Sequence, residues 1–213
     1  MRHRLRASAV FSMLLLFSSC GPVKSLFPLF LDSDKVFDAT LLGEWRELPD
    51  PNQKAPNQGD PKRKESSSKD ENARWFFSKN EDGLSYDLSV SEPGKKDSNR
   101  VNARLVRLGD ALFVDLTDEE QDPADTTGSA SVSAIPAHII GRIQLDKNEM
   151  TLSLLDEQWV SNQVDKGNFP LAQVKSPDGE VLFCTTEELR KFVSIHADDK
   201  EAFSFAWRLA RVK

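Results

Sequence analysis

The chain has 213 residues, of which 38% are hydrophobic and 29% charged, and its formal net charge is −6. This length suffices for one domain with a hydrophobic core, and thirteen phenylalanines and four tryptophans supply aromatic bulk to fill it. An acidic chain lacks the positive footprint of a nucleic-acid-binding protein, so we expect no nucleic-acid partner.

The first nineteen residues have the three parts of a secretory signal peptide. Three arginines within the first six residues form a basic head, an apolar run follows over 7–17, and Ser18 and Ser19 provide a small-residue exit. The apolar part is shorter than the roughly 20 residues that a membrane-spanning helix needs. We therefore expect residues 1–19 to be a signal peptide.

The exit from this leader resembles the lipobox of bacterial lipoproteins. Ser18, Ser19 and Cys20 match the pattern, whereas Phe17 stands where the family usually has leucine. The resemblance implies cleavage before Cys20 and a diacylglycerol on its sulfur, which supplies the two acyl chains that stable anchoring takes. The mature protein would then be an exported, membrane-anchored lipoprotein of the cell envelope, and Gly21 favours the outer membrane if one is present. The alternative is a secreted protein cut near Ser19, with Cys20 an incidental thiol.

Removal of the leader takes the formal net charge from −6 to −9, since three arginines leave with it. We expect a lipidated tether over 20–39 and a single β-barrel-like domain over 40–213. Two polar stretches, 49–72 and 118–134, are too poor in nonpolar residues to offset the entropy of ordering them, so we expect disordered loops there. The acidic residues of the second loop lack the spacing of a calcium loop, and no metal site is expected.

The second cysteine, Cys184, has no partner if Cys20 is acylated, so the fold does not depend on disulfides. Its neighbours are nonpolar, and this context is typical of a buried, inert thiol.

Short segments with nonpolar residues at every second position dominate the remainder and predict strands. The nonpolar phase shifts within 101–108, which suggests a β-bulge there. Asp156 is placed to cap a helix to about Val164, and Thr185 to Glu188 form a capping box for a helix to about Ala197. The predicted strands are 40–48, 74–78, 84–90, 101–108, 111–117, 136–145, 149–155, 180–184 and 202–212.

This pattern predicts a mainly β fold, an antiparallel lipocalin-like β-barrel of about eight to nine strands with one or two short helices. The first strand carries Gly43 and Trp45, which resemble the Gly-x-Trp signature of the lipocalins. That resemblance implies that Trp45 plugs the closed end of the barrel and is covered by an arginine of the final strand. Arg211 is the matching position, and Arg208 is the second choice. Two helices around 180–184, where the family has one main helix, depart from its pattern.

The sequence contains no Gly-x-Ser-x-Gly elbow, His-Glu-x-x-His, phosphate loop or Cys-x-x-Cys motif, so we expect neither an enzyme nor a bound cofactor. His138 and His196 are interpreted as surface or capping residues. Two roles remain. The first is a structural or interaction protein that docks on another envelope component. The second is a carrier that holds a small hydrophobic molecule inside the barrel.

Overall fold

The computed structural model describes residues 22–34, 36–49, 72–93, 98–118, 137–176 and 179–212. The expected signal peptide, Cys20 and nearly all of the two expected polar loops lie outside these residues.

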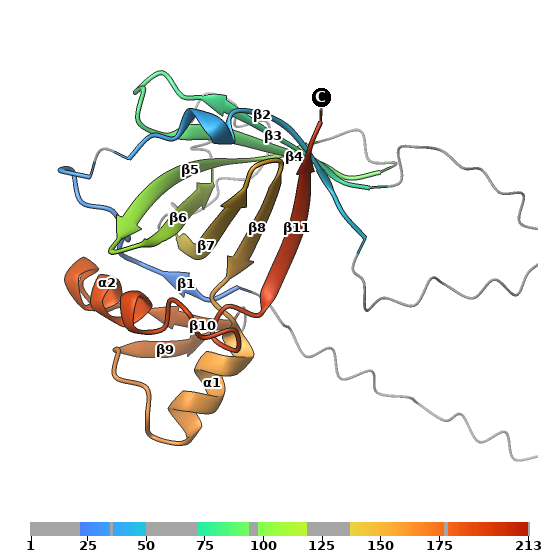
Figure 1. The fold of residues 1–213 in the computed structure, drawn as a ribbon. Coiled ribbons are helices and arrows are strands. Elements are labelled where there is room, and N and C mark those ends of the chain that lie inside the picture. Colours follow the sequence, from blue (N-terminus) through green and yellow to red (C-terminus); the bar gives the residue numbers. More distant parts are fainter. Residues whose placement is uncertain are drawn as a thin grey trace, which may run out of the picture.

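The described chain is mainly β, and eight of its strands form a closed antiparallel barrel (Figure 1). Consecutive strands pair with one another except where β11 returns between β2 and β8, which closes the barrel. The expected fold class is therefore confirmed. The barrel strands are β2 (Gly43–Glu47), β3 (Arg74–Lys79), β4 (Tyr86–Ser91), β5 (Ser98–Leu108), β6 (Ala111–Asp118), β7 (His138–Asp146), β8 (Glu149–Leu154) and β11 (Phe205–Arg211).

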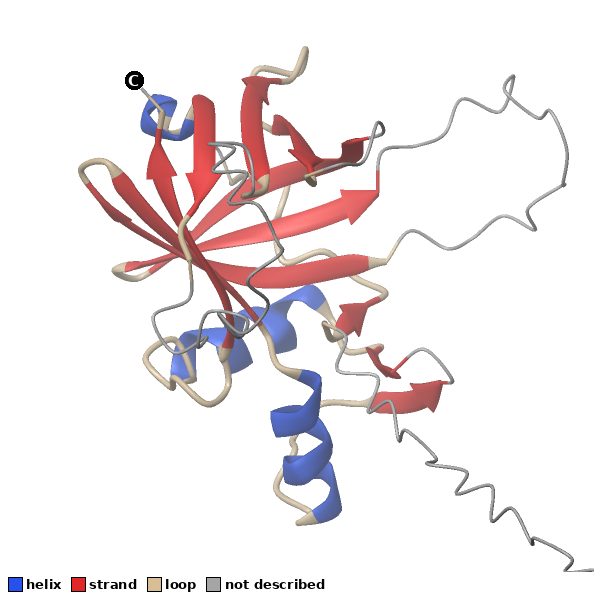
Figure 2. Ribbon diagram, turned by 90° about the vertical axis from the view of Figure 1, so that its right-hand side faces the viewer, coloured by secondary structure: helices blue, strands red, loops and turns tan. Residues whose placement is uncertain are grey.

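A small sheet and two helices lie against one side of this barrel (Figures 1 and 2). β1 pairs with the start of β7 and, in parallel, with β10, which in turn pairs with β9. Sequence reasoning missed β1 and β9. These elements are β1 (Lys24–Ser25), η1 (Ala39–Leu41), α1 (Glu157–Asp165), β9 (Gln173–Ser176), β10 (Gly179–Leu182) and α2 (Thr186–Ile195).

The barrel interior is filled by the nonpolar residues at alternate strand positions. Residues directly opposite one another on neighbouring strands point to the same face, so the predicted phases of β6, β7 and β8 converge on one core. Gly141 belongs to this face because a Cβ there would lie only 3.0–3.1 Å from three nonpolar side chains. The buried members of this interior core are Leu41, Trp45, Trp75, Phe77, Tyr86, Leu88, Ala103, Leu105, Leu112, Val114, Leu116, Ile143, Met150, Leu152, Leu154 and Leu209.

A second core lies outside the barrel, between its wall and the helices. Val106 and Phe113 project outward from β5 and β6 into a cluster with Trp159 of α1 and Phe192 of α2. β5 pairs residue for residue with β6 through this stretch, so the expected bulge is absent. The nonpolar phase shifts because both faces of β5 are buried.

Both helices begin where the sequence predicted. The Asp156 carboxylate accepts a hydrogen bond from the Trp159 N–H at 2.8 Å, and the Thr185–Glu188 capping box is complete. The strand prediction for 202–212 is less accurate at its start. Phe203 precedes β11 and packs in the outer core, instead of sharing the inner face of the strand.

The segment expected to be a tether is folded onto the barrel over residues 22–34. Leu29 is fully buried in the outer core, so this part of the segment packs on the domain. Phe27 and Leu31 are exposed. We call residues 22–34 the N-terminal strap.

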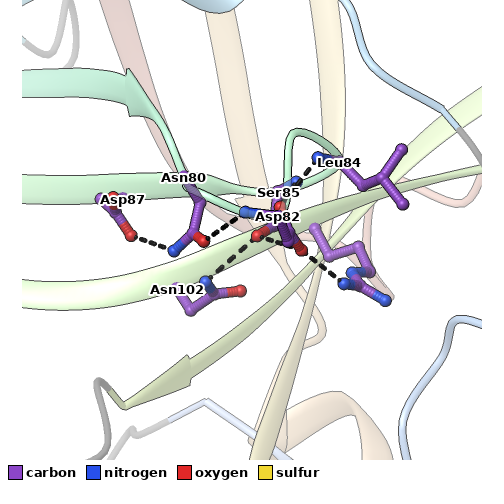
Figure 3. A network of polar contacts seen from close by, with 7 residues as sticks. Asn80, Asp82, Leu84, Ser85, Asp87 and Asn102 are labelled. Carbon is purple, nitrogen blue, oxygen red and sulfur yellow. Dashed lines mark hydrogen bonds and ion pairs between the residues drawn. The ribbon is translucent and has the colours of Figure 1, made fainter.

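The turn between β3 and β4 is held by a polar network centred on Asp82 (Figure 3). One carboxylate oxygen accepts the backbone N–H groups of Leu84 and Ser85 at 2.8 Å, and the other accepts Arg104 at 2.8 Å. Partial burial opposes ionisation of Asp82, but these donors together with the Ser85 hydroxyl outweigh it and lower the pKa to about 2.

Candidate functional site

One end of the barrel is closed by Trp45. Its indole Nε1 donates to the Leu41 carbonyl at 2.9 Å, and the Arg211 guanidinium lies 4.3 Å from the centre of its ring. Arg211 also donates to the carbonyls of Leu42, at 2.8 Å, and of Thr40. A single side chain thus joins the end of β11 to the start of β2.

The structure brings Gly43, Trp45 and Arg211 together in the arrangement that the lipocalin resemblance implies. Gly43 has φ = +110°, a conformation that residues with a side chain rarely adopt. Arg208, the second choice for the covering arginine, instead forms an exposed ion pair with Glu149 at 3.3 Å. Trp45 and Arg211 therefore form a structural plug at the closed end of the barrel.

Tyr86 completes the closed end. Its hydroxyl accepts the Asp38 N–H at 2.7 Å and donates to the Asp38 carbonyl at 3.0 Å, and its ring stacks on Phe37 at 4.9 Å. Burial raises the pKa of Tyr86 to about 12, so the hydroxyl keeps its proton and both hydrogen bonds at physiological pH. Ionisation of Tyr86 is therefore not expected to open this end near neutrality.

Aromatic side chains line the interior from Trp75, which lies directly opposite Trp45 on the neighbouring strand, to Phe205 at the other end of the barrel. Trp207 and Phe205 pair with the inward-facing Leu152 and Leu154, so they face the interior. The Trp207 ring centre lies 5.1 Å from that of Trp75 and 4.7 Å from that of Phe205. We call Trp75, Trp207, Phe205 and Glu47 the mouth cluster.

Exposure rises through the mouth cluster. Trp75 is 5% exposed, Trp207 is half-buried, and Phe205 is 44% exposed despite its inward register. A phenylalanine whose neighbours leave it partly uncovered offers a nonpolar surface that another molecule can bury.

Trp75 also carries an unused hydrogen-bond donor. Its Nε1 is buried and has no hydrogen-bond partner among the described residues. A buried unsatisfied donor costs about 1–3 kcal/mol, and indole N–H groups usually find an acceptor when buried. A ligand with a hydrogen-bond acceptor placed next to Trp75 Nε1 would therefore satisfy this donor.

Glu47 adds a carboxyl group to the mouth. It pairs directly with the inward-facing Leu209, and its backbone N–H donates to the Ala73 carbonyl at 3.0 Å. Trp75 lies two residues beyond Ala73 on the same face, which makes it a diagonal neighbour of Glu47. Burial raises the pKa of Glu47, as expected for a carboxyl group in nonpolar surroundings.

A second polar group lies outside the barrel, under the N-terminal strap. Asp115 is buried, and its carboxylate accepts the Leu29 N–H at 2.6 Å and contacts His138 Nδ1 at 2.7 Å. The expectation that His138 is a surface or capping residue is wrong because the strap covers it. His196 does cap α2, as expected, and packs against Trp159.

Cys184 is buried, and burial raises the pKa of its thiol. Over the described ranges, no group of three His, Cys, Asp or Glu side chains is placed to hold a metal. Within the same ranges, every helix is too short or too polar to cross a bilayer.

Depressions are present in the described part of the barrel. The larger two, of about 350 and 360 Å³, lie beside the β5–β6 hairpin and share Arg142 and Asp110. A third, of about 320 Å³, surrounds Phe76 on β3. All three are half open, and their linings are more polar than a typical small-molecule site.

No family model, no curated protein and no solved structure matches this chain. Its function therefore has to be argued from its own residues.

Proposed function

We propose that this protein is an envelope lipoprotein, anchored through Cys20, whose barrel binds a small amphiphile at the mouth cluster. The leader and the Ser18–Cys20 pattern support the anchor. The observation that carries the binding role is the mouth cluster itself, in which partly exposed rings adjoin a buried N–H that has no partner in the described part of the chain.

The closed half of the barrel limits what can bind. Trp45, Phe77 and Tyr86 fill it and are fully or almost fully buried. The nonpolar part of the ligand would therefore lie against Phe205 and Trp207, near the barrel rim, while an acceptor atom reaches Trp75.

The surroundings of Glu47 select among amphiphiles. Burial raises the pKa of Glu47, so the mouth disfavours a carboxylate, and a fatty acid would bring a second carboxyl group into it. A neutral acceptor, such as the ester carbonyl of a monoacylglycerol, satisfies Trp75 without placing another ionisable group there. We therefore assign a neutral, single-chain lipid as the ligand class.

Anchoring is tested with Cys20→Ala. We expect the variant to leave the membrane fraction entirely, because no acyl chain can be attached without the sulfur. Cys184→Ala serves as the matched control and should stay with the membranes, since this thiol is buried in the domain. Fractionation followed by intact mass measurement checks the result; retention of the Cys20 variant on membranes would contradict the anchor.

Ligand binding is tested by titrating the protein with a monoacylglycerol while following tryptophan fluorescence. We expect a saturable change, weakened at least about tenfold by Trp207→Ala, since burial of an aromatic ring contributes a few kcal/mol. Trp75→Phe keeps an aromatic ring at this position but loses the indole N–H and part of the ring surface, and should weaken binding at least about fivefold, the size of one hydrogen bond. Phe76→Ala is the control, because Phe76 adjoins Trp75 in β3 but faces outward.

Docking on another envelope component is the second candidate. The exposed Phe76, in its depression on the barrel wall, favours it. Absence of saturable binding for both a monoacylglycerol and a fatty acid would leave this role as the better one.

A further inference from the structure

We propose that the outward face of the small β1–β10–β9 sheet rests on the bilayer to which Cys20 is attached. This inference goes beyond ligand binding at the mouth, and it depends on the proposed anchor. Four observations carry it: the short chain before the strap, the fixation of the strap, the nonpolar character of the sheet face and the lysine at its edge.

The chain leaves almost no slack between the anchor and the domain. Pro22 forms a backbone bridge with Asp156, and the next residue, Val23, is buried in the outer core. Cys20 lies two residues before Pro22, and two residues span at most about 7 Å. The acylated sulfur therefore cannot move far from the surface around Pro22.

The strap itself cannot act as a spacer, because contacts along its length tie it to the domain. Leu29 donates to the buried Asp115, and the Thr186 hydroxyl donates to the Pro28 carbonyl at 2.8 Å. Asp34 forms a half-buried ion pair with Arg190 at 2.5 Å. These contacts fix which side of the molecule lies next to the membrane.

The surface next to Pro22 is the small sheet, whose short strands lie at the lower right of Figure 2, beside the helices. Leu182 of β10 is buried in the outer core, so its neighbours Val181 and Phe183 face outward. Phe183 is 48% exposed, and Val174, directly opposite Val181 on β9, is 52% exposed. Phe27, which follows β1, is also exposed.

Lys24 completes this face. It pairs with Val181 on the other side of β10, so it shares the outward face only two residues after Pro22. A lysine bordering nonpolar side chains can place its stem against the acyl boundary and its ammonium against lipid phosphates. In a chain of net charge −9 after removal of the leader, a face of this composition fits a lipid surface.

The test compares two phenylalanines of equal exposure. Phe76, 49% exposed, lies on β3, four strands around the eight-stranded barrel from β7, to which the small sheet is attached. Full-length, lipidated protein is reconstituted in phosphatidylethanolamine–phosphatidylglycerol vesicles as Phe183→Cys or Phe76→Cys, each combined with Cys184→Ala. The new thiol carries an environment-sensitive fluorophore, and the vesicles contain lipids with a nitroxide quencher.

We expect lipid quenching at position 183 to exceed that at position 76 at least about threefold. Equal, weak quenching of both labels on vesicles that retain the protein would overturn the contact but leave the anchor intact. A label at 183 that is shielded without being quenched by lipid would show that a protein covers the face, which also overturns it. Protein that fails to stay on the vesicles would refute the anchor, and thus the proposed function. If Phe183→Cys does not fold, Val174→Cys replaces it with the same expected result.

Discussion

Trp45→Ala should lower the free energy of unfolding by about 3–5 kcal/mol, the range for removing a fully buried tryptophan. The loss includes the transfer of the indole from water, the cavity that it leaves, and the loss of the Arg211 contact. Trp45→Ala also removes the hydrogen bond to Leu41. Urea denaturation followed by circular dichroism measures the change.

Two further variants make this result interpretable. Phe76→Ala, on the outer face of the neighbouring strand, should cost less than about 1 kcal/mol because its side chain is half exposed. Arg211→Lys keeps the positive charge but loses the planar fork that bonds two carbonyls, and should cost about 1–2 kcal/mol. A loss below about 1 kcal/mol for Trp45→Ala would show that the plug does not stabilise the barrel.

Asp115→Ala should cost about 3 kcal/mol, the second largest effect that we expect. The substitution leaves the Leu29 N–H buried without an acceptor and removes the partner of His138. Breaking a buried polar pair from one side is costly because the remaining group stays desolvated. Unfolding in urea gives the magnitude, and hydrogen exchange should show faster exchange in the strap than in β8.

Asp115→Asn provides the matched control. Its amide oxygen can still accept the Leu29 N–H, so the loss should fall to about half or less. If the alanine and asparagine variants were equally stable, the hydrogen bond from the Leu29 N–H to residue 115 would not be what holds the strap on the barrel.

The sequence predicts the barrel well because most of its strands have one nonpolar and one polar face. Met150, Leu152 and Leu154 alternate with polar residues and all face the interior core. β5 breaks the pattern, since Leu105 faces the interior while Val106 faces the helices. A single sequence shows the change of phase but not the second core that causes it.

What the sequence could not predict depends on contacts between distant residues. β1 is two residues long and cannot display a period, and β9 has little nonpolar character. Asp115, set between nonpolar residues of β6, reads as solvent-facing because its partner Leu29 is 86 residues away. The contact between Trp207 and Trp75, and the Trp75 indole N–H that lacks a partner among the described residues, likewise depend on residues far apart in the sequence.

The pairing of the first strands with the last ones has a consequence for how this chain folds. β1 pairs with β10, and β2 pairs with β11, so the earliest strands have partners near the other end of the sequence. Such distant pairings make folding slow, since a long loop must close before any contact compensates for the lost entropy. The barrel cannot close until β11 is available. On the proposed export route, in which the chain is threaded through a membrane from its N-terminus, this fold would be completed only after β11 had crossed.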